Sequence, residues 1–289
     1  YFEPEEEMNP EEPEEEPEER SYIKQIARGD GFNPPEIEKQ EQKIYQNWTK
    51  RLKKELQLII EYLEENTLIN TNLLRACHKH DVQKVISIGS TCIYPDVVEE
   101  YPMKEKDLFN GPPPPDNFAY AMSKRLMVTQ IDSYKKQYNR DWSYLVPCNL
   151  YGEHDKYEEH HSHFVSALIK KLYEAENKVE IWGTGKPLRQ FMYAGDLARV
   201  IKDMIENDIV GNFNVAPDDG ISIEEITKIG IEACGKGDLE IVYDKTKPDG
   251  QYRKDVDSSK LLSVLKDFEF TSLRDGISKV YEDYCERYR

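Results

Sequence analysis

Two short apolar runs, separated by a stretch long enough for a helix, constrain the fold of this chain more than any other feature. Residues 84–89 (KVISIG) are typical of a buried strand, and residues 144–147 (YLVP) are typical of the next one. Between them we expect a helix after Tyr120, with core positions at Leu126, Met127, Ile131 and Tyr134. Strands that alternate with helices predict an α/β fold with a parallel sheet and crossover helices over residues 67–152.

The chain after residue 152 has shorter apolar runs and predicts a smaller α/β lobe over residues 153–289. Strands are expected at Val179–Trp182, Phe213–Ala216 and Leu239–Tyr243. Helices are expected at roughly 162–176 and 222–234.

The chain before residue 67 has a different composition. Residues 1–20 hold eleven Glu, four Pro and one Arg, so they carry most of the net charge of −17. Such a segment cannot bury enough apolar surface to offset its ordering entropy, and we expect a disordered tail over residues 1–33, with an acidic docking tail as the alternative. Residues 34–66 predict an amphipathic helix, either packed on the domain behind it or free to bind a partner. Its apolar stripe consists of Ile44, Trp48, Leu52, Leu56, Ile59 and Leu63.

Charge, hydropathy and cysteine use exclude several classes of protein. The chain has no run of about 18 apolar residues, so no membrane span is expected. A net charge of −17 argues against a nucleic-acid partner. The five cysteines are widely spaced and odd in number, which fits neither a disulfide framework nor a zinc site and favours a reducing, cytoplasmic setting.

The sharpest chemical signal is a Tyr-x-x-x-Lys pattern at Tyr120 and Lys124, near the start of a predicted helix. A spacing of four places both side chains on one helical face. A nearby ammonium group is expected to lower the tyrosine pKa, so that the phenol can exchange a proton with a carbonyl or hydroxyl group. Ser90 follows the strand that ends near residue 88, and its hydroxyl is expected at the same crevice.

Residues 147–163 form a second candidate stretch after a strand. They contain His154, His160, His161 and His163. A metal site is one interpretation, but no Cys or carboxylate partner has convincing zinc spacing, so none is predicted. A single histidine that donates a proton is the better functional hypothesis.

Several ordered motifs together resemble the GDP-L-fucose synthase family of extended short-chain dehydrogenases/reductases, within the NAD-dependent epimerase/dehydratase family. The resemblance covers about 220 residues, from about residue 68 onward. The motifs are STCIYP at 90–95, NGPP at 110–113, Tyr120 with Lys124, PCNLYG at 147–152, SH at 162–163, WGTGKPLRQF at 182–191 and KPDGQ at 247–251.

The resemblance implies a Rossmann-like NADP-binding domain over residues 67–152 and a mainly substrate-binding lobe over residues 153–289. It also implies an NADP(H)-dependent enzyme that converts GDP-4-keto-6-deoxy-D-mannose to GDP-L-fucose, as a homodimer. Epimerisation at C3 and C5 would precede reduction of the C4 ketone. Ser90, Tyr120 and Lys124 match the family's reductase triad, and Cys92 with His163 matches its epimerisation pair. The resemblance also implies cofactor contacts by Tyr120, Lys124, Pro147, Cys148, Asn149, Leu150 and His163. It implies nucleotide-sugar contacts by Lys171, Trp182, Arg189 and Asp249.

The sequence departs from the family before residue 68. A glycine-rich turn that brings a helix N-terminus to the pyrophosphate is expected there, yet Gly29 and Gly31 are the only glycines and follow no predicted strand. The first strands of the Rossmann sheet are therefore expected to be missing or replaced. The alternatives are a fragment of a longer enzyme, a non-catalytic or degenerate nucleotide-sugar-binding protein, and a related nucleotide-sugar epimerase or dehydratase.

Overall fold

The computed structural model describes residues 39–158, 162–217 and 220–288, with side chains from Ile59 onward. The chain divides into two compact units, residues 1–56 and 57–289, and the account below concerns the second unit. The acidic tail expected over residues 1–33 lies outside the described residues, as do the side chains of the first four residues of the expected apolar stripe.

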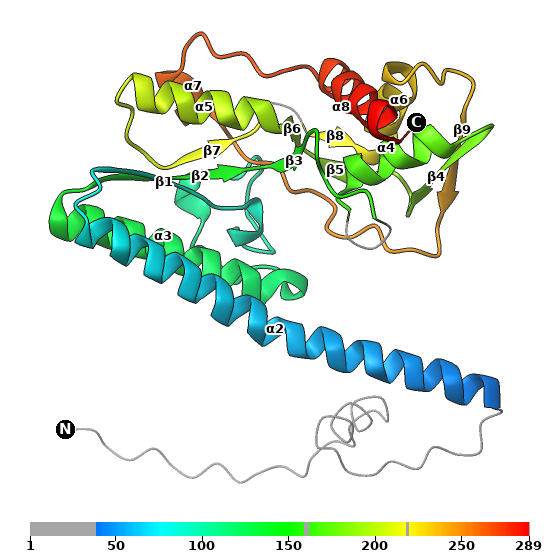
Figure 1. The fold of residues 1–289 in the computed structure, drawn as a ribbon, viewed down its shortest axis with the longest axis horizontal. Helices are drawn as coiled ribbons and strands as arrows, with labels where there is room; N and C mark the ends of the chain where they lie inside the picture. Colours follow the sequence, from blue (N-terminus) through cyan, green and yellow to red (C-terminus); the bar gives the residue numbers. More distant parts are fainter. Residues whose placement is uncertain (1–38, 159–161, 218–219, 289) are drawn as a thin grey trace. The chain divides into compact units, whose positions relative to one another are not determined.

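Helices and parallel strands alternate along the second unit (Figure 1). The α-helices are α2 (Lys39–Lys79), α3 (Phe118–Tyr138), α4 (Phe164–Glu174), α5 (Ala194–Glu206), α6 (Ile223–Ala233), α7 (Ser259–Val264) and α8 (Leu273–Tyr288). The strands are β1 (Lys84–Ile88), β2 (Asp141–Pro147), β3 (Asn149–Tyr151), β4 (Lys178–Trp182), β5 (Leu188–Arg189), β6 (Phe191–Tyr193), β7 (Phe213–Val215), β8 (Ile221–Ser222) and β9 (Glu240–Asp244). Three 3₁₀ helices are η1 (Thr91–Ile93), η2 (Glu105–Asp107) and η3 (Pro115–Asn117).

Helix α2 is longer than the helix expected over residues 34–66, because it continues to Lys79. Residues 39–79 contain neither glycine nor proline, so nothing in the local sequence ends the helix earlier. The separate helical stretch expected around Leu73, Leu74 and Ala76 is the last part of this same helix.

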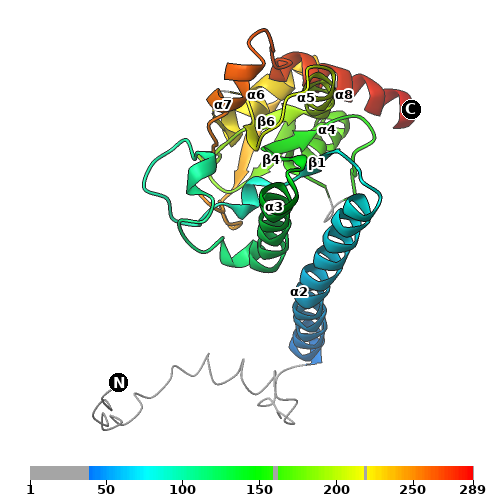
Figure 2. The same ribbon diagram turned by 90° about the vertical axis from the view of Figure 1, so that its left-hand side faces the viewer.

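The main sheet has the strand order β1-β2-β7, and all three strands are parallel. Helix α3 and the end of α2 cover one face of this sheet, and α5 covers the other (Figures 1 and 2). Gln130 Nε2 donates to Thr71 Oγ1 at 2.8 Å and joins α3 to α2. The core between these layers includes Ile131, Leu145 and Val200, each fully buried. The parallel α/β architecture expected from the sequence is therefore confirmed.

A second cluster of apolar side chains lies among α4, α6 and α8, with Ile169, Ile226 and Ile277 at its centre. Strands β4 and β9 pair in parallel beside it, and β5 and β8 form a short antiparallel pair. The expected strand at Phe213–Ala216 does not belong to this lobe, because β7 pairs with β2 in the main sheet. The chain thus returns to the first domain after entering the second one.

Two further findings bear on the sequence-based expectations. Leu126 is 41% exposed, so its assignment to the core is wrong, whereas Met127 and Ile131 are buried as expected. Leu126 is turned about 100° around the α3 axis from the buried Met127, which is enough to bring it to the surface. In the part of the chain that the structure describes, no helix is sufficiently long and apolar to span a bilayer.

Candidate active site

The carboxyl end of β1 presents Ser90 and Cys92 in a tight turn. Ser90 is the N-cap of η1, and its Oγ accepts a hydrogen bond from the Cys92 backbone N–H at 3.3 Å. Gly89 permits this turn to lie against β2, because a Cβ atom at Gly89 would lie 3.1 Å from the Leu145 carbonyl oxygen. Both side chains are half-buried at the carboxyl end of β1, the edge at which parallel sheets commonly place a ligand crevice.

Helix α3 brings Tyr120 and Lys124 to the same turn. Lys124 Nζ donates to the Ile88 carbonyl oxygen at 3.1 Å, which ties the helix to the end of β1. The same Nζ lies 5.9 Å from the centre of the Tyr120 ring. The Tyr120 hydroxyl forms a hydrogen bond with Ser90 and lies close enough to Cys92 for their charges to interact. The structure therefore brings Ser90, Cys92, Tyr120 and Lys124 together.

The pKa of Tyr120 differs from the expectation. Burial raises this pKa, and the neighbouring Cys92 raises it further, while the hydrogen bond with Ser90 lowers it. The Lys124 ammonium group is directed to the Ile88 carbonyl, and burial lowers the pKa of Lys124 itself. The expected lowering by Lys124 is thus wrong in this arrangement. The phenol stays protonated at neutral pH, which suits a proton donor.

Lys254 joins this cluster from a distant part of the sequence. Its Nζ lies 3.2 Å from Cys92 Sγ. Sequence reasoning missed Lys254, since no periodicity or motif spacing links it to a residue 162 positions away. The only available signal was its place four residues after the KPDG segment at 247–250.

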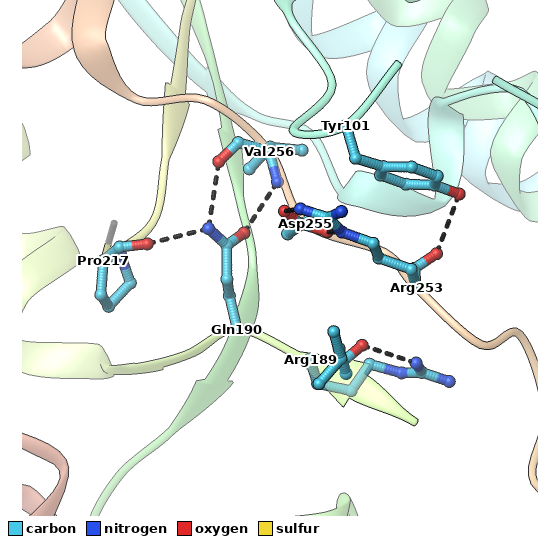
Figure 3. Close-up of polar contacts among 8 residues, drawn as sticks. Tyr101, Arg189, Gln190, Pro217, Arg253, Asp255 and Val256 are labelled. Carbon is cyan, nitrogen blue, oxygen red and sulfur yellow. Dashed lines mark hydrogen bonds and ion pairs between the residues drawn. The ribbon is translucent and has the colours of Figure 1, made fainter. Parts of the chain in front are cut away.

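The segment that carries Lys254 is held by the amide of Gln190, a residue with no exposed surface. Gln190 Nε2 donates to the carbonyl oxygens of Pro217 at 2.8 Å and Val256 at 3.0 Å. The Val256 N–H donates to Gln190 Oε1 at 2.8 Å (Figure 3). Gln190 lies between β5 and β6, whereas Pro217 precedes α6 and Val256 follows it. One side chain therefore connects β5 and β6 to two segments that are far apart in the sequence.

His163 is the N-cap residue of α4, and its carbonyl accepts the Ala167 N–H at 2.9 Å. Its side chain is exposed. Within residues 39–158, 162–217 and 220–288, no hydrogen bond joins it to the Ser90–Lys124 cluster. Its expected place beside Cys92 therefore stays a prediction.

The residues expected to contact a cofactor lie at the end of β2 and in β3. The Cys148 N–H donates to the Val215 carbonyl at 3.0 Å, and the Asn149 side-chain amide donates to the Gln190 carbonyl at 2.9 Å. Cys148 is buried, and burial raises the pKa of its thiol. Pro147 ends β2 and Leu150 is half-buried in β3. The side chains of Pro147 and Leu150 therefore offer an apolar contact surface rather than hydrogen-bonding groups.

The polar groups at this crevice fit the reactive end of a nicotinamide cofactor. Lys124 uses one ammonium hydrogen for the Ile88 carbonyl and keeps two for ligand hydroxyl groups. The half-buried Tyr120 hydroxyl lies beside it, at the carboxyl end of a parallel strand.

A second group of side chains surrounds Trp182, whose ring is 56% exposed at the end of β4. Lys171 Nζ lies 5.9 Å and Lys247 Nζ lies 5.4 Å from the indole ring. Lys171 also donates to the Glu180 carbonyl at 2.8 Å. A flat, exposed ring flanked by two cations suits a base and an anionic group.

The loop after Trp182 fixes Asp249. The Thr184 N–H donates to Asp249 Oδ1 at 2.6 Å, and Thr184 Oγ1 donates to Oδ2 at 2.8 Å. These bonds lower the pKa of the Asp249 carboxyl. Gly183 has φ +75°, and a Cβ atom there would overlap the same carboxylate, so only glycine fits at this position.

Arg189 lies in β5, beside Gly250 of the same loop. Its guanidinium group donates to the Leu188 carbonyl at 2.8 Å, and burial lowers its pKa. In the described part of the chain Arg189 forms no ion pair. The loops at 183–187 and 247–251 thus contact each other, and they connect the four expected nucleotide-sugar residues Lys171, Trp182, Arg189 and Asp249.

Metal binding receives no support from the described residues, because no group of three or more His, Cys, Asp or Glu side chains there is arranged to hold an ion. His160 and His161 lie outside the described residues.

Comparison with a family model gives a match over residues 50–216 to the NAD-dependent epimerase/dehydratase family. A probable GDP-L-fucose synthase of Drosophila melanogaster is 34% identical over 244 residues, which cover 79% of this chain and 75% of the relative. The GDP-L-fucose synthase of Escherichia coli K12 is 32% identical over 241 residues, with 78% of this chain and 74% of the relative covered.

Solved structures give the same result. A GDP-L-fucose synthetase from Naegleria fowleri, bound to NADP, superposes with a TM-score of 0.73 at 29% identity. The superposition covers 80% of this chain and 75% of the Naegleria chain. The chain therefore spans about three quarters of the length of the relatives it matches.

Proposed function

The chain belongs to the NAD-dependent epimerase/dehydratase family as an NADP(H)-dependent oxidoreductase/epimerase of the GDP-L-fucose synthase type, and we propose that it converts GDP-4-keto-6-deoxy-D-mannose to GDP-L-fucose. The observation that carries this proposal is the convergence of Ser90, Cys92, Tyr120 and Lys124 at the carboxyl end of β1. A phenol, a hydroxyl and an ammonium group serve the reduction of a ketone, and a thiol serves the epimerisation of the carbons beside it.

Reduction of the C4 ketone needs a hydride and a proton. When bound, NADPH supplies the hydride. Tyr120 donates the proton to the C4 oxygen, and its raised pKa keeps that proton in place at neutral pH. Ser90 orients the same oxygen through its hydroxyl, and Lys124 holds the start of α3 against β1.

Epimerisation at C3 and C5 exploits the acidity of protons next to a ketone. One group breaks the C–H bond and takes the proton, while the electron pair moves toward the C4 oxygen. A second group then returns a proton to the opposite face of the carbon. We assign these two roles to Cys92 and His163.

The nucleotide half of the substrate would lie on the group around Trp182. The indole ring offers a packing surface, and Lys171 and Lys247 lie beside it. Arg189 is half-buried and forms no ion pair within the described residues, so a diphosphate would supply the missing counter-charge. Asp249 is ordered by Thr184 and accepts hydrogen bonds from hydroxyl groups.

The test is oxidation of NADPH by the full chain when the 4-keto sugar is added. Tyr120→Phe removes the proton donor and is expected to lower kcat by about 100-fold or more. Tyr138→Phe, at an exposed position on the same helix, is the matched control and should keep full activity. A folded wild-type protein without turnover, or an active Tyr120→Phe variant, would refute the proposal.

A non-catalytic nucleotide-sugar-binding protein is the second candidate, because the exposed Trp182 with Lys171 and Lys247 can hold a nucleotide whether or not NADPH binds at the end of β1. Calorimetry separates the two functions. The enzyme binds both the GDP-sugar and NADPH, whereas the alternative binds the GDP-sugar alone.

We propose that a second copy of the chain covers an apolar face formed by α2 and α3. We assign to this face the exposed apolar side chains of Ile59, Tyr62, Ile69 and Leu73 on α2 and of Phe118, Met122 and Leu126 on α3, all between 38% and 63% exposed. Two helices from each copy can pack as a four-helix arrangement about a two-fold axis. Ile69→Glu is expected to convert a dimer to a monomer in analytical ultracentrifugation, and a monomeric wild-type protein would refute this part.

A further inference from the structure

The contact between Lys254 and Cys92 is the feature that the proposed reaction leaves unexplained. Lys254 Nζ lies 3.2 Å from Cys92 Sγ, and both side chains are half-buried. An ammonium group that points at a sulfur atom stabilises the negatively charged form of that sulfur. No step described above assigns a task to Lys254.

The backbone on both sides of Lys254 is fixed, so the contact follows from the fold. The Tyr101 hydroxyl donates to the Arg253 carbonyl at 3.0 Å, and the Met103 N–H donates to the Asp255 carbonyl at 2.9 Å. One residue later, Gln190 holds both backbone groups of Val256 (Figure 3). Lys254 is therefore held between the loop at 101–103 and the strands of the second lobe.

The charged neighbours of Lys254 are occupied with each other. Arg253 Nε and Nη2 donate to the two carboxylate oxygens of Asp255 at 2.6 and 2.8 Å. Within the described residues, no carboxylate forms an ion pair with Lys254. Of three consecutive charged side chains, Lys254 is the one whose charge is directed to the crevice.

The turn that carries Cys92 also meets two titratable groups of α3. Tyr120 interacts with Cys92 and keeps its proton, so it adds no charge at neutral pH. Lys124 points to the Ile88 carbonyl. Ser90 accepts the Cys92 N–H and carries no charge. Lys254 is thus the charged group in hydrogen-bond contact with the sulfur atom.

We propose that Lys254 is a positioning residue that keeps Cys92 as a thiolate and directs its sulfur atom toward the sugar ring. This inference rests on the proposed function for the identity of the substrate. In the step that Lys254 supports, a C–H bond beside the ketone breaks and an S–H bond forms. The electron pair moves to the C4 oxygen, and no oxidant or reductant is consumed. Lys254 itself gains and loses no proton.

Alkylation of Cys92 tests the contact without any substrate. The full chain is treated with iodoacetamide at pH 7, and modification of Cys92 is followed by peptide mass spectrometry, with Cys92→Ser as the blank for the other four cysteines. Lys254→Met should lower the rate at Cys92 by about tenfold or more, because only the thiolate reacts. Lys254→Arg keeps the charge and should stay within about threefold of the wild type. Rates of all three proteins should converge in strong alkali, where every thiol is ionised.

Equal alkylation rates in wild type and Lys254→Met at pH 7 would overturn the inference. Loss of reactivity in Lys254→Arg, equal to that in Lys254→Met, would also overturn it, because charge would then not be the cause. If Lys254→Met does not fold, Lys254→Gln replaces it in the same comparison.

Exchange of substrate protons links the contact to catalysis. In deuterated water, Lys254→Met should incorporate deuterium at C3 and C5 at least about tenfold more slowly than the wild type, with KM within about twofold. A normal exchange rate in this variant contradicts the inference but leaves the proposed function intact. Conversely, an alkylation contrast in a protein that turns over no GDP-sugar would refute the proposed function and keep the pairing of Lys254 with Cys92.

Discussion

Gln190 offers the most direct test of how this fold is held together. Its side-chain amide forms three hydrogen bonds to backbone groups, two to Val256 and one to Pro217. Gln190→Met keeps a side chain of similar length and shape but removes all three bonds. The Val256 N–H and carbonyl then stay buried without partners, because Val256 is 1% exposed.

The expected loss follows from the burial of each partner. An unsatisfied buried backbone group costs about 1–3 kcal/mol. The two bonds to Val256 are buried, whereas the bond to Pro217 is part-buried, so water can partly replace it. We therefore expect Gln190→Met to lower the free energy of unfolding by about 2–6 kcal/mol, from the two buried groups of Val256.

Urea denaturation at 25 °C, followed by circular dichroism, measures this loss by linear extrapolation. Gln137→Met is the matched control, since Gln137 is exposed and bonds only to the exposed Tyr138 hydroxyl. The control should change the free energy of unfolding by less than about 0.5 kcal/mol. A loss below about 1 kcal/mol in Gln190→Met would refute the reasoning, because it would mean that Val256 finds other partners.

Two further predictions concern the Asp249 loop and alkaline pH. Gly183→Ala places a methyl group against the Asp249 carboxylate and should weaken GDP binding by about tenfold in calorimetry. The control is Gly235→Ala, which carries similar backbone strain at φ +67° but has no atom within 4 Å of the added methyl group, so it should leave GDP binding unchanged. Equal effects of the two substitutions would contradict this account. Burial raises the pKa of Tyr157 to about 12, and a hydrogen bond to Glu153 raises the pKa of Tyr193 to about 12, from a usual value of 10.0. The unfolded chain therefore loses these protons first, and the free energy of unfolding in urea should fall between pH 10 and 12, less steeply in Tyr193→Phe; a constant value over that range would contradict it.

Several parts of the site could be predicted from the sequence because they depend on neighbours along the chain. Ser90 and Cys92 follow β1 directly, so their place at the strand end follows from strand periodicity. Tyr120 and Lys124 share a helical face because they are four residues apart. The parallel pairing of β1 with β2 follows from the helix between them.

Other parts depended on burial, which no local pattern reports. The sequence predicted that Lys124 lowers the pKa of Tyr120, yet burial of the phenol dominates and raises this pKa. Leu126 has the same apolar character as Met127 but is exposed. Which of two adjacent apolar residues is buried depends on the rotation of the helix against its neighbours.

The sequence by itself therefore determined the α/β class, the order of the first elements and the chemistry placed at the end of β1. Only the tertiary structure decided that β7 returns to the main sheet beside β2 and that Gln190 fixes the chain around Val256. It also decided that Lys254 contacts Cys92 across 162 residues of sequence. The physical reason is that these contacts join segments far apart in the chain, where position is set by packing and buried hydrogen bonds rather than by helix or strand periodicity.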